Sequence, residues 1–209
     1  MTKIAAQIAE KLLQINAIKL NPQNPFTWAS GIKSPIYCDN RIALSEPTTR
    51  NLICDAFSIQ CMRFSPFYGI AGVATAGIAH GALVAQRLDK PFAYVRSKPK
   101  EHGRQNQIEG KVEPNTEWLM IEDLVSTGGS VLKAAEAMEA ADVKIKAVLS
   151  IFTYGFAEAE AAFNERNIDF IPLLDYPTLI EIAIEKNYID EGQQSLLMEW
   201  RKDPRNWNY

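Results

Sequence analysis

Cysteines, long apolar runs and excess positive charge are scarce or missing in this chain of 209 residues. The three cysteines, Cys38, Cys54 and Cys61, are odd in number, and their spacing fits neither a zinc site nor a disulfide framework, which favours packing roles in a reducing compartment. No apolar run approaches the roughly 20 residues that a membrane-spanning helix needs, so we expect no membrane role. The formal net charge of -3 argues against a nucleic-acid partner, because such binding generally requires a basic surface.

A secretory signal is also not expected at the amino terminus. The segment Met1–Leu20 carries charges at Lys3, Glu10, Lys11 and Lys19 where a signal would have a compact apolar stretch and a cleavage site. We therefore expect a cytoplasmic protein. The chain is long enough for one substantial domain and short for two, so a single domain over residues 1–209 is predicted.

Short apolar runs alternate with helical segments along the chain. Helices are predicted from Thr2 to Ala17, with Thr2 available as an N-cap, and from Glu46 to Met62. The runs that predict strands are Tyr68–Ala71, Phe92–Val95, Trp118–Ile121, Ile145–Phe152 and Phe170–Leu174. This alternation indicates an α/β fold with a central, mainly parallel sheet flanked by helices on both faces.

The segment from Trp118 to Ser130 (WLMIEDLVSTGGS) carries the most informative functional pattern. An apolar strand ends in Glu122 and Asp123 and runs into a turn of small residues that opens a helix. Ligands of such sheets bind beyond the carboxyl ends of the strands. The turn Ser126–Ser130 offers backbone N–H groups and hydroxyls at a helix N-terminus, which suits a phosphate. The carboxylates could accept hydrogen bonds from sugar hydroxyls and stabilise positive charge on a ribose ring, so a phosphorylated sugar satisfies both halves.

Residue types alone leave a second interpretation of this segment open. Glycine, serine and threonine are common in ordinary turns between a strand and a helix, and paired carboxylates at a strand end are often only solvated. Other nucleotide motifs fit badly, because the chain has no P-loop pattern and its glycines at positions 69, 72, 77 and 81 do not form the dinucleotide-binding pattern.

A second polar segment, Arg96–Gly110, collects cations in an otherwise acidic protein. Its basic side chains could surround a pyrophosphate, and its glycines would let the chain fold over the site and withdraw. We predict a mobile loop over about residues 97–110 that excludes water from a reactive sugar cation. Taken alone, the stretch favours a solvated, partly disordered loop without a specific role.

Four segments together resemble known families. The order of residues 118–130 resembles the phosphoribosyl pyrophosphate signature of type I phosphoribosyltransferases. The pattern Arg-x-x-x-Lys-x-His-Gly from Arg96 resembles the catalytic loop of orotate phosphoribosyltransferases, and Phe-Thr-x-x-Ser-Gly-x-x-Ser-Pro-x-Tyr from Phe26 to Tyr37 resembles their amino-terminal hood. The turn Ala71–Ile78 resembles their pyrophosphate loop. The resemblance implies a type I phosphoribosyltransferase fold with a hood from about residues 18–45.

The resemblance also implies a reaction and its components. Ribose 5-phosphate would pass from phosphoribosyl pyrophosphate to orotate, giving orotidine 5'-phosphate and pyrophosphate in the biosynthesis of UMP. Mg²⁺ would be required and held mainly through the substrate, with no metal ligands expected from the protein. The family's loop reaches into the active site of a neighbouring subunit, which implies a homodimer.

Each matching residue acquires an expected role from the same resemblance. Catalysis is expected from Lys100, His102 and Asp123. Binding of phosphoribosyl pyrophosphate is expected from Arg96, Lys100, His102, Glu122, Asp123, Leu124, Val125, Ser126, Thr127, Gly128, Gly129 and Ser130. Orotate is expected to contact Ser126, Tyr37 and Cys38.

The chain also departs from the family pattern. Some orotate phosphoribosyltransferases carry lysines where this chain has Ala29 and Ala76, and an arginine near Tyr154, so three cations are missing here. His80 is predicted to lie on a helix face without a catalytic role. Two alternatives remain: a purine phosphoribosyltransferase, and a non-catalytic regulator that senses nucleotides on the same fold.

Lys100 gives the first testable prediction. Replacing Lys100 by Ala should reduce turnover severely, because the leaving pyrophosphate loses its main cationic partner, while the fold stays intact by circular dichroism. Near-normal turnover of this variant would remove Lys100 from the mechanism.

Overall fold

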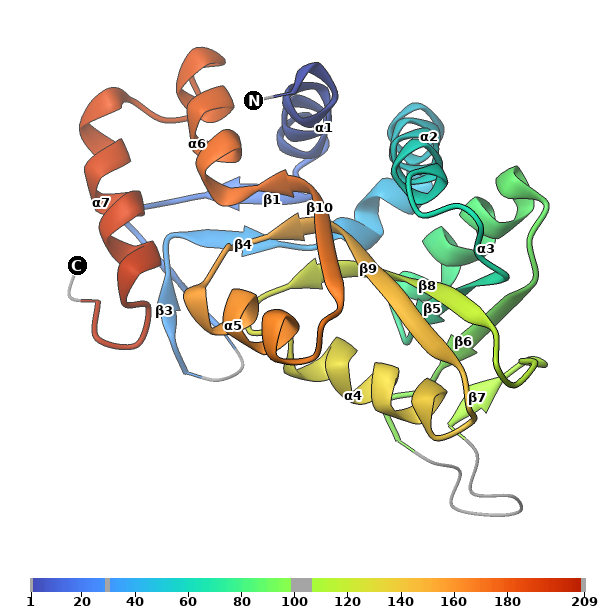
Figure 1. The fold of residues 1–209 in the computed structure, drawn as a ribbon. Coiled ribbons are helices and arrows are strands. Elements are labelled where there is room, and N and C mark those ends of the chain that lie inside the picture. The colour runs from blue at the N-terminus through green and yellow to red at the C-terminus, as the bar shows by residue number, and fades with distance from the viewer. Residues whose placement is uncertain (1, 29–30, 99–106, 208–209) are drawn as a thin grey trace. The chain divides into compact units, whose positions relative to one another are not determined.

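The computed structural model describes residues 2–28, 31–98 and 107–207 (Figure 1). The packing of the chain divides it into two compact units, one formed by Met1–Arg50 with Leu174–Tyr209 and the other by Asn51–Leu173. The single domain over residues 1–209 therefore stays a prediction. Within the described ranges, no helix combines the length and the apolar character needed to cross a bilayer.

A six-stranded sheet forms the centre of the second unit. Its strands, in spatial order, are β10 (Asp169–Asp175), β9 (Lys144–Thr153), β8 (Glu117–Val125), β5 (Gly69–Val73), β6 (Phe92–Val95) and β7 (Ile108–Glu109). Strand β5 pairs in parallel with β6 and β8, and β8 pairs in parallel with β9, whereas β7 runs antiparallel to β6. The predicted sheet, mainly parallel and flanked by helices, is confirmed.

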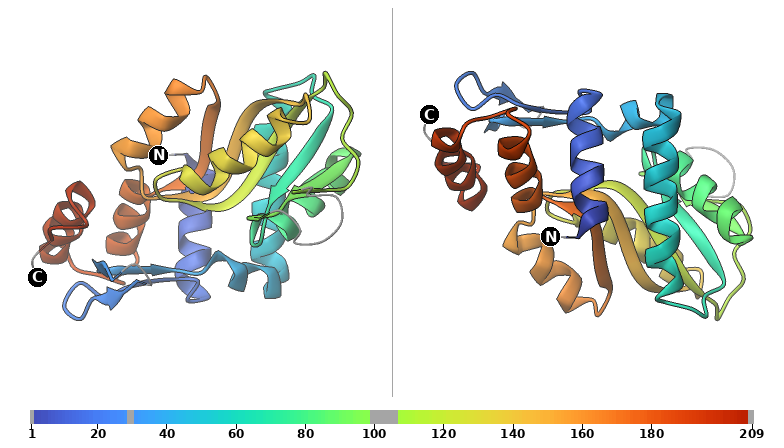
Figure 2. Two further views of the ribbon diagram at one scale, coloured as in Figure 1. Left: turned by 90° about the horizontal axis from the view of Figure 1, so that it is seen from below. Right: turned by 90° about the horizontal axis from the view of Figure 1, so that it is seen from above.

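Helices cover both faces of this sheet. They are α2 (Pro47–Met62), whose first residues belong to the other unit, α3 (Gly77–Leu88), α4 (Gly129–Glu139) and α5 (Ala157–Glu165). Seen from below, α4 lies in front of the sheet, and seen from above, α2 and α3 do (Figure 2). The core under α4 and α5 includes the buried side chains of Trp118, Met120, Val131, Met138 and Phe163. Burying such apolar side chains is the main source of stability for this layer.

Glycines allow α3 to approach the sheet closely. A Cβ at Gly77 would lie 2.3 Å from the carbonyl oxygen of Ile121 in β8, and one at Gly72 would lie 2.9 Å from the carbonyl oxygen of Gly77. Real Cβ atoms do not approach backbone atoms this closely. Glycine at both positions therefore sets how near the N-terminus of α3 lies to β5 and β8.

In its described residues, the first unit combines three α-helices and a 3-10 helix with two small antiparallel sheets. Its elements are α1 (Lys3–Gln14), β1 (Ile18–Leu20), β2 (Phe26–Thr27), β3 (Lys33–Ser34), β4 (Ile36–Cys38), a 3-10 helix (Asn40–Ser45), α6 (Tyr176–Glu185) and α7 (Glu191–Lys202). Strand β1 pairs with β4, and β2 pairs with β3. Side-chain caps begin all three α-helices, because Thr2, Asp175 and Asp190 each accept a hydrogen bond from a first-turn backbone N–H.

Most elements agree with the predictions from sequence within a few residues, and three features do not. The predicted strand Trp118–Ile121 continues to Val125, so both carboxylates lie inside β8 and not beyond it. The sequence favours two short strands in the hood, around Phe26–Trp28 and Pro35–Tyr37, whereas the structure has four, which pair as β1 with β4 and β2 with β3. The last part of the predicted mobile loop forms β7, so the polar stretch rejoins the sheet at Ile108. The extent of the loop stays a prediction, because residues 99–106 lie outside the described ranges.

Gly77 offers a test of the close packing of α3. Replacing Gly77 by Ala should lower the free energy of unfolding by about 3 kcal/mol, because the new methyl group would overlap the backbone of β8. Gly129→Ala is the matched control, since its Cβ would meet open space. Urea denaturation measures the free energy of unfolding of both variants. Equal values for the two would contradict the close contact of Gly77 with β8.

Candidate active site

Strand β8 brings the predicted phosphate and ribose residues to one edge of the sheet. Since β5, β6, β8 and β9 are parallel, their carboxyl ends lie at the same edge. Neighbouring strands pair with β8 on both sides, and Glu122 lies opposite Ser150 of β9. Strand pairing therefore fixes the backbone of β8 at Glu122, the first of the two carboxyl residues.

The two carboxyl groups on β8 differ in their surroundings. Glu122 is only 7% exposed, whereas Asp123 is half-buried. The backbone N–H of Asp123 donates a hydrogen bond of 2.8 Å to Oε1 of Glu122. Burial, followed by the neighbouring Asp123 side chain, raises the pKa of Glu122 to about 9. Glu122 is therefore protonated at neutral pH, so its carboxyl group can both donate a hydrogen bond to a sugar hydroxyl and accept one from it.

The turn after β8 leads into an open helix N-terminus. Gly128 has a left-handed φ of 82°, and α4 begins at Gly129 without a cap from any described side chain. Thr127, Gly129 and Ser130 are exposed, and a Cβ at Gly129 would meet nothing within 4 Å. The first N–H groups of a helix have no partner inside it, so this end of α4 is suited to an anion.

Residues behind this turn hold it in place. The Thr153 hydroxyl donates to the carbonyl oxygen of Val125 (3.0 Å) and accepts from the N–H of Gly155 (3.0 Å). A Cβ at Gly128 would lie 3.2 Å from the ring of Phe163, so α5 packs directly under the turn. Neither supporting residue is marked by a motif, because a buried threonine or phenylalanine looks like any core residue in sequence.

The base of the cationic loop joins the same edge of the sheet. Arg96 follows β6, where its N–H donates to the carbonyl oxygen of Gln107 (2.8 Å) and the Gln107 amide donates back to the carbonyl oxygen of Arg96 (3.1 Å). The Arg96 guanidinium lies 3.4 Å from the Glu109 carboxylate, and both side chains are partly exposed. This contact is long and weak, so the guanidinium can exchange it for a ligand. The predicted catalytic residues Lys100 and His102 lie outside the described residues.

The turn between β5 and α3 lies beside the base of that loop. The N–H of Ala74 donates to the carbonyl oxygen of Val95 (2.9 Å), and the peptide bond between Ala74 and Thr75 is cis. His80, one helical turn into α3, is buried, and its ring nitrogens have no hydrogen-bond partner among the described residues. Burial lowers the pKa of His80 to about 4. His80 is therefore neutral at physiological pH and belongs to the buried face of α3.

Tyr37 and Cys38, the residues expected to contact orotate, lie on β4 in the first unit. Tyr37 is 41% exposed, and its ring centroid lies 5.7 Å from that of Phe26. The Cys38 thiol lies 3.3 Å from the side-chain oxygen of the buried Asn40. Their roles, like that of Ser126 in the second unit, stay predictions.

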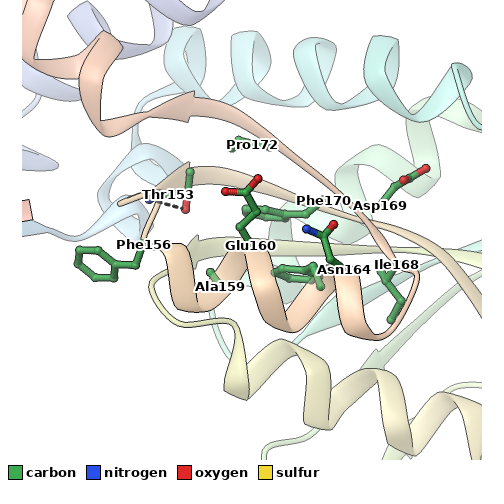
Figure 3. Close-up of a pocket in the computed structure, with 11 residues that line it drawn as sticks. Thr153, Phe156, Ala159, Glu160, Asn164, Ile168, Asp169, Phe170 and Pro172 are labelled. Carbon is green, nitrogen blue, oxygen red and sulfur yellow. Dashed lines mark hydrogen bonds between the residues drawn. The ribbon is translucent and has the colours of Figure 1, made fainter. Parts of the chain in front are cut away.

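A pocket of about 380 Å³ lies between α5 and β10 (Figure 3). Its lining consists of Thr153, Gly155, Phe156, Ala159, Glu160, Phe163, Asn164, Ile168, Asp169, Phe170 and Pro172. Of the residues predicted to bind substrate, none within the described ranges lines this pocket. Phe163 is shared, because it stacks on Phe170 in the pocket wall and also supports Gly128. The pocket therefore lies behind the phosphate turn and is not the predicted substrate site.

Comparison with known proteins decides the family. Residues 68–169 match the phosphoribosyl transferase domain model. An orotate phosphoribosyltransferase of Enterococcus faecalis is 50% identical over 208 residues, which cover 99% of each chain. The chain belongs to the orotate phosphoribosyltransferase family.

Solved structures agree with the fold of an orotate phosphoribosyltransferase. The chain is similar to UMP synthase of Leishmania donovani (TM-score 0.79, 23% identity, 94% of this chain and 42% of that longer one). It is also similar to the orotate phosphoribosyltransferase of Aeropyrum pernix (TM-score 0.75, 24% identity, 83% and 96% covered). The predicted type I phosphoribosyltransferase fold and the predicted family, glycosyltransferases of pyrimidine biosynthesis, are confirmed.

Membership of the orotate phosphoribosyltransferase family decides between the alternatives left by the sequence. The close relatives carry the orotate name, so neither the purine enzyme nor the regulator is supported. Near the position where some family members have an arginine, this chain has two aromatic residues in contact. The buried Tyr154 stacks on Phe156 with ring centroids 5.4 Å apart. Ala76 immediately precedes α3, and Ala29 lies outside the described residues.

The raised pKa of Glu122 predicts how stability depends on pH. As pH rises from about 4.5 towards about 9, the unfolded chain loses this proton while the folded chain keeps it, so the free energy of unfolding should fall. Glu122→Gln has no such proton and should lack this part of the decline. Urea denaturation of both proteins at about pH 5 and about pH 8 measures the difference. An identical pH dependence in the two proteins would contradict the burial of a protonated Glu122.

The hydrogen bond from the Thr153 hydroxyl to Val125 leads to a prediction about substrate binding. Thr153→Val should raise the KM for phosphoribosyl pyrophosphate roughly tenfold, because the carbonyl of Val125 loses its anchor and the phosphate turn shifts. Thr153→Ser retains the hydroxyl and should restore the KM. Equal KM values for the valine and serine variants would show that the hydroxyl does not position the turn.

Proposed function

We propose that this chain transfers ribose 5-phosphate from phosphoribosyl pyrophosphate to orotate at the carboxyl end of β8. One observation carries the proposal. The neighbouring carboxyl groups of Glu122 and Asp123 stand just before the turn of residues 126–128, which leads into the uncapped N-terminus of α4 at Gly129. A ribose 5-phosphate has hydroxyls and a phosphate in the same order, so its two ends match the two halves of the site.

Each half of the site has a defined part in binding. The backbone and hydroxyls of Ser126–Ser130 hold the 5-phosphate, whose charge is stabilised by the dipole of α4. Asp123 and Glu122 hold the ribose hydroxyls. Leu124 and Val125 connect the two halves, and the pairing of β8 with β9 fixes the spacing between them.

The chemical step is a substitution at the anomeric carbon. The bond from this carbon to the pyrophosphate oxygen breaks, a bond to the orotate ring nitrogen forms with inversion, and the proton of that nitrogen passes to the departing pyrophosphate. Positive charge develops on the ribose as the leaving group departs. The Asp123 carboxylate stabilises this charge, and the acidic ring nitrogen of orotate makes a strong protein base unnecessary.

Departure of pyrophosphate requires positive charge on the other side of the site. Arg96 supplies it from the base of the cationic loop, after its weak contact with Glu109 is exchanged. Lys100 and His102 are assigned to the same anion, with Lys100 stabilising the leaving group. Closure of the loop would also exclude water, which could otherwise react with the ribose.

The residues of the site fit a Mg²⁺ ion that arrives with the substrate. Within the described residues, no three acidic, histidine or cysteine side chains gather to form a metal site. Mg²⁺ needs only one or two carboxylates when substrate phosphates supply the other oxygens, and the half-buried Asp123 would provide one. When bound, it neutralises charge on the pyrophosphate. The orotate contacts of Tyr37, Cys38 and Ser126, the homodimer with a shared loop, and a cytoplasmic location complete the proposal.

The activity is measured from the fall in orotate absorbance when purified protein meets orotate, phosphoribosyl pyrophosphate and Mg²⁺. Adenine, guanine, xanthine and uracil are tested in parallel, and a chelator is added in a separate reaction. We expect turnover with orotate alone and its loss with the chelator, because the pyrophosphate would keep its full charge.

Each other outcome removes a defined part of the proposal. Turnover with a purine base would retain the sugar-phosphate site and contradict the assigned base. Full activity with the chelator would contradict the role of Mg²⁺, and no turnover with any base would contradict the proposed reaction.

A further inference from the structure

The carboxy-terminal helix α7 is tied to the β2–β3 hairpin of the hood. Trp200 is completely buried, and its indole N–H donates a hydrogen bond of 3.0 Å to the backbone carbonyl of Lys33. These two residues are 167 positions apart in the sequence. Because the acceptor of this hydrogen bond is a backbone carbonyl, the bond constrains the position of β3 independently of the side chains of β3.

Aromatic packing adds to this connection on both sides of Trp200. The ring of Trp28, which follows β2, meets Trp200 edge-to-face with centroids 5.6 Å apart and an angle of 84°. Tyr176, at the start of α6, is the second aromatic neighbour of Trp200, with ring centroids 5.7 Å apart. The Tyr176 hydroxyl donates a hydrogen bond to the carbonyl oxygen of Leu197 in α7 (3.1 Å). Edge-to-face packing is directional, so Trp200 restricts the orientation of Trp28 as well as burying it.

The connection continues from Trp28 to the strand expected to meet orotate. The Trp28 indole N–H donates to the carbonyl of Ile36 (3.3 Å), and the hydroxyl of the buried Ser34 donates to the same carbonyl (2.8 Å). The next residues along β4 are Tyr37 and Cys38. Two hydrogen bonds therefore fix the peptide immediately before the proposed orotate contacts, and one of them comes from the ring that Trp200 orients.

We propose that Trp200 is a positioning residue for orotate. It acts through Trp28 and the Lys33 carbonyl to hold the backbone of Tyr37 and Cys38, and it does not touch the substrate itself. This inference rests on the proposed function, and it assigns a role to a helix outside the matched phosphoribosyl transferase region of residues 68–169. The affinity for orotate, and not that for phosphoribosyl pyrophosphate, should depend on α7.

A purely structural role for Trp200 makes a different prediction. If it only stabilises the fold, its loss lowers the amount of active protein, so the apparent turnover falls while both KM values stay the same. If it positions the hood, the KM for orotate rises selectively. The KM for phosphoribosyl pyrophosphate then serves as an internal reference, because its proposed phosphate and ribose contacts lie on β8, on the turn that follows it and at the start of α4.

The test compares Trp200→Phe with Tyr176→Phe in steady-state assays that vary each substrate separately. The first variant keeps an aromatic ring and loses the bond to Lys33, whereas the control loses the buried bond to Leu197 within the same aromatic group. We expect Trp200→Phe to raise the KM for orotate about tenfold, as for the loss of one buried hydrogen bond, with the other KM unchanged. Tyr176→Phe should leave both KM values near those of the wild type.

A second variant covers the case in which Trp200→Phe does not fold. Trp28→Phe removes the bond to Ile36 and should produce the same selective rise in the KM for orotate. Unchanged orotate KM values, or equal rises for both substrates, would overturn the positioning role in an active enzyme. A wild-type chain without orotate turnover would instead overturn the proposed function, and this inference with it.

Discussion

Tight packing of α3 against β5 and β8 is the constraint on which the site depends. Gly72 and Gly77 let the helix backbone approach the strands to a distance that no other residue permits. The approach fixes the turn after β5 beside the end of β8. The carboxyl ends of β5, β6 and β8 then share one edge, and the acidic pair, the phosphate turn and the base of the cationic loop all lie along it.

Burial gives the two neighbouring carboxyl groups different properties. Glu122 keeps its proton because it is removed from water beside a second acid, while Asp123 remains half-buried. A second negative charge at Glu122 would repel the phosphate proposed to bind at the turn that opens α4. With Glu122 protonated, the strand end can accept hydrogen bonds from the ribose without adding that charge beside the anion.

Much of the fold and the central motif could be predicted from sequence. The alternation of apolar runs with helical segments identified all the parallel strands of the sheet, because buried parallel strands read as short continuous apolar runs. The segment from Glu122 to Ser130 was recognisable because its order of acids, apolar positions and small residues is local. The full length of β8 could not be predicted from the sequence. Pairing with β9 extends this strand through two acidic residues that would otherwise end it.

The supporting contacts had no signal in the sequence. Thr153 and Phe163 act on the phosphate turn from β9 and α5, and Trp200 reaches the hood from α7. Each is a buried residue whose partner is distant along the chain. Neither the amino-acid composition nor the hydrophobic periodicity of a segment can show such a partner. A local pattern therefore reveals the groups that meet the substrate, and the structure adds the residues that hold those groups.

The most direct test of the account is a crystal structure of the protein with orotidine 5'-phosphate. We expect the phosphate within hydrogen-bonding distance of the backbone N–H groups of residues 127–130, and the ribose hydroxyls within hydrogen-bonding distance of Asp123 and Glu122. A phosphate bound elsewhere, for example in the pocket between α5 and β10, would contradict it.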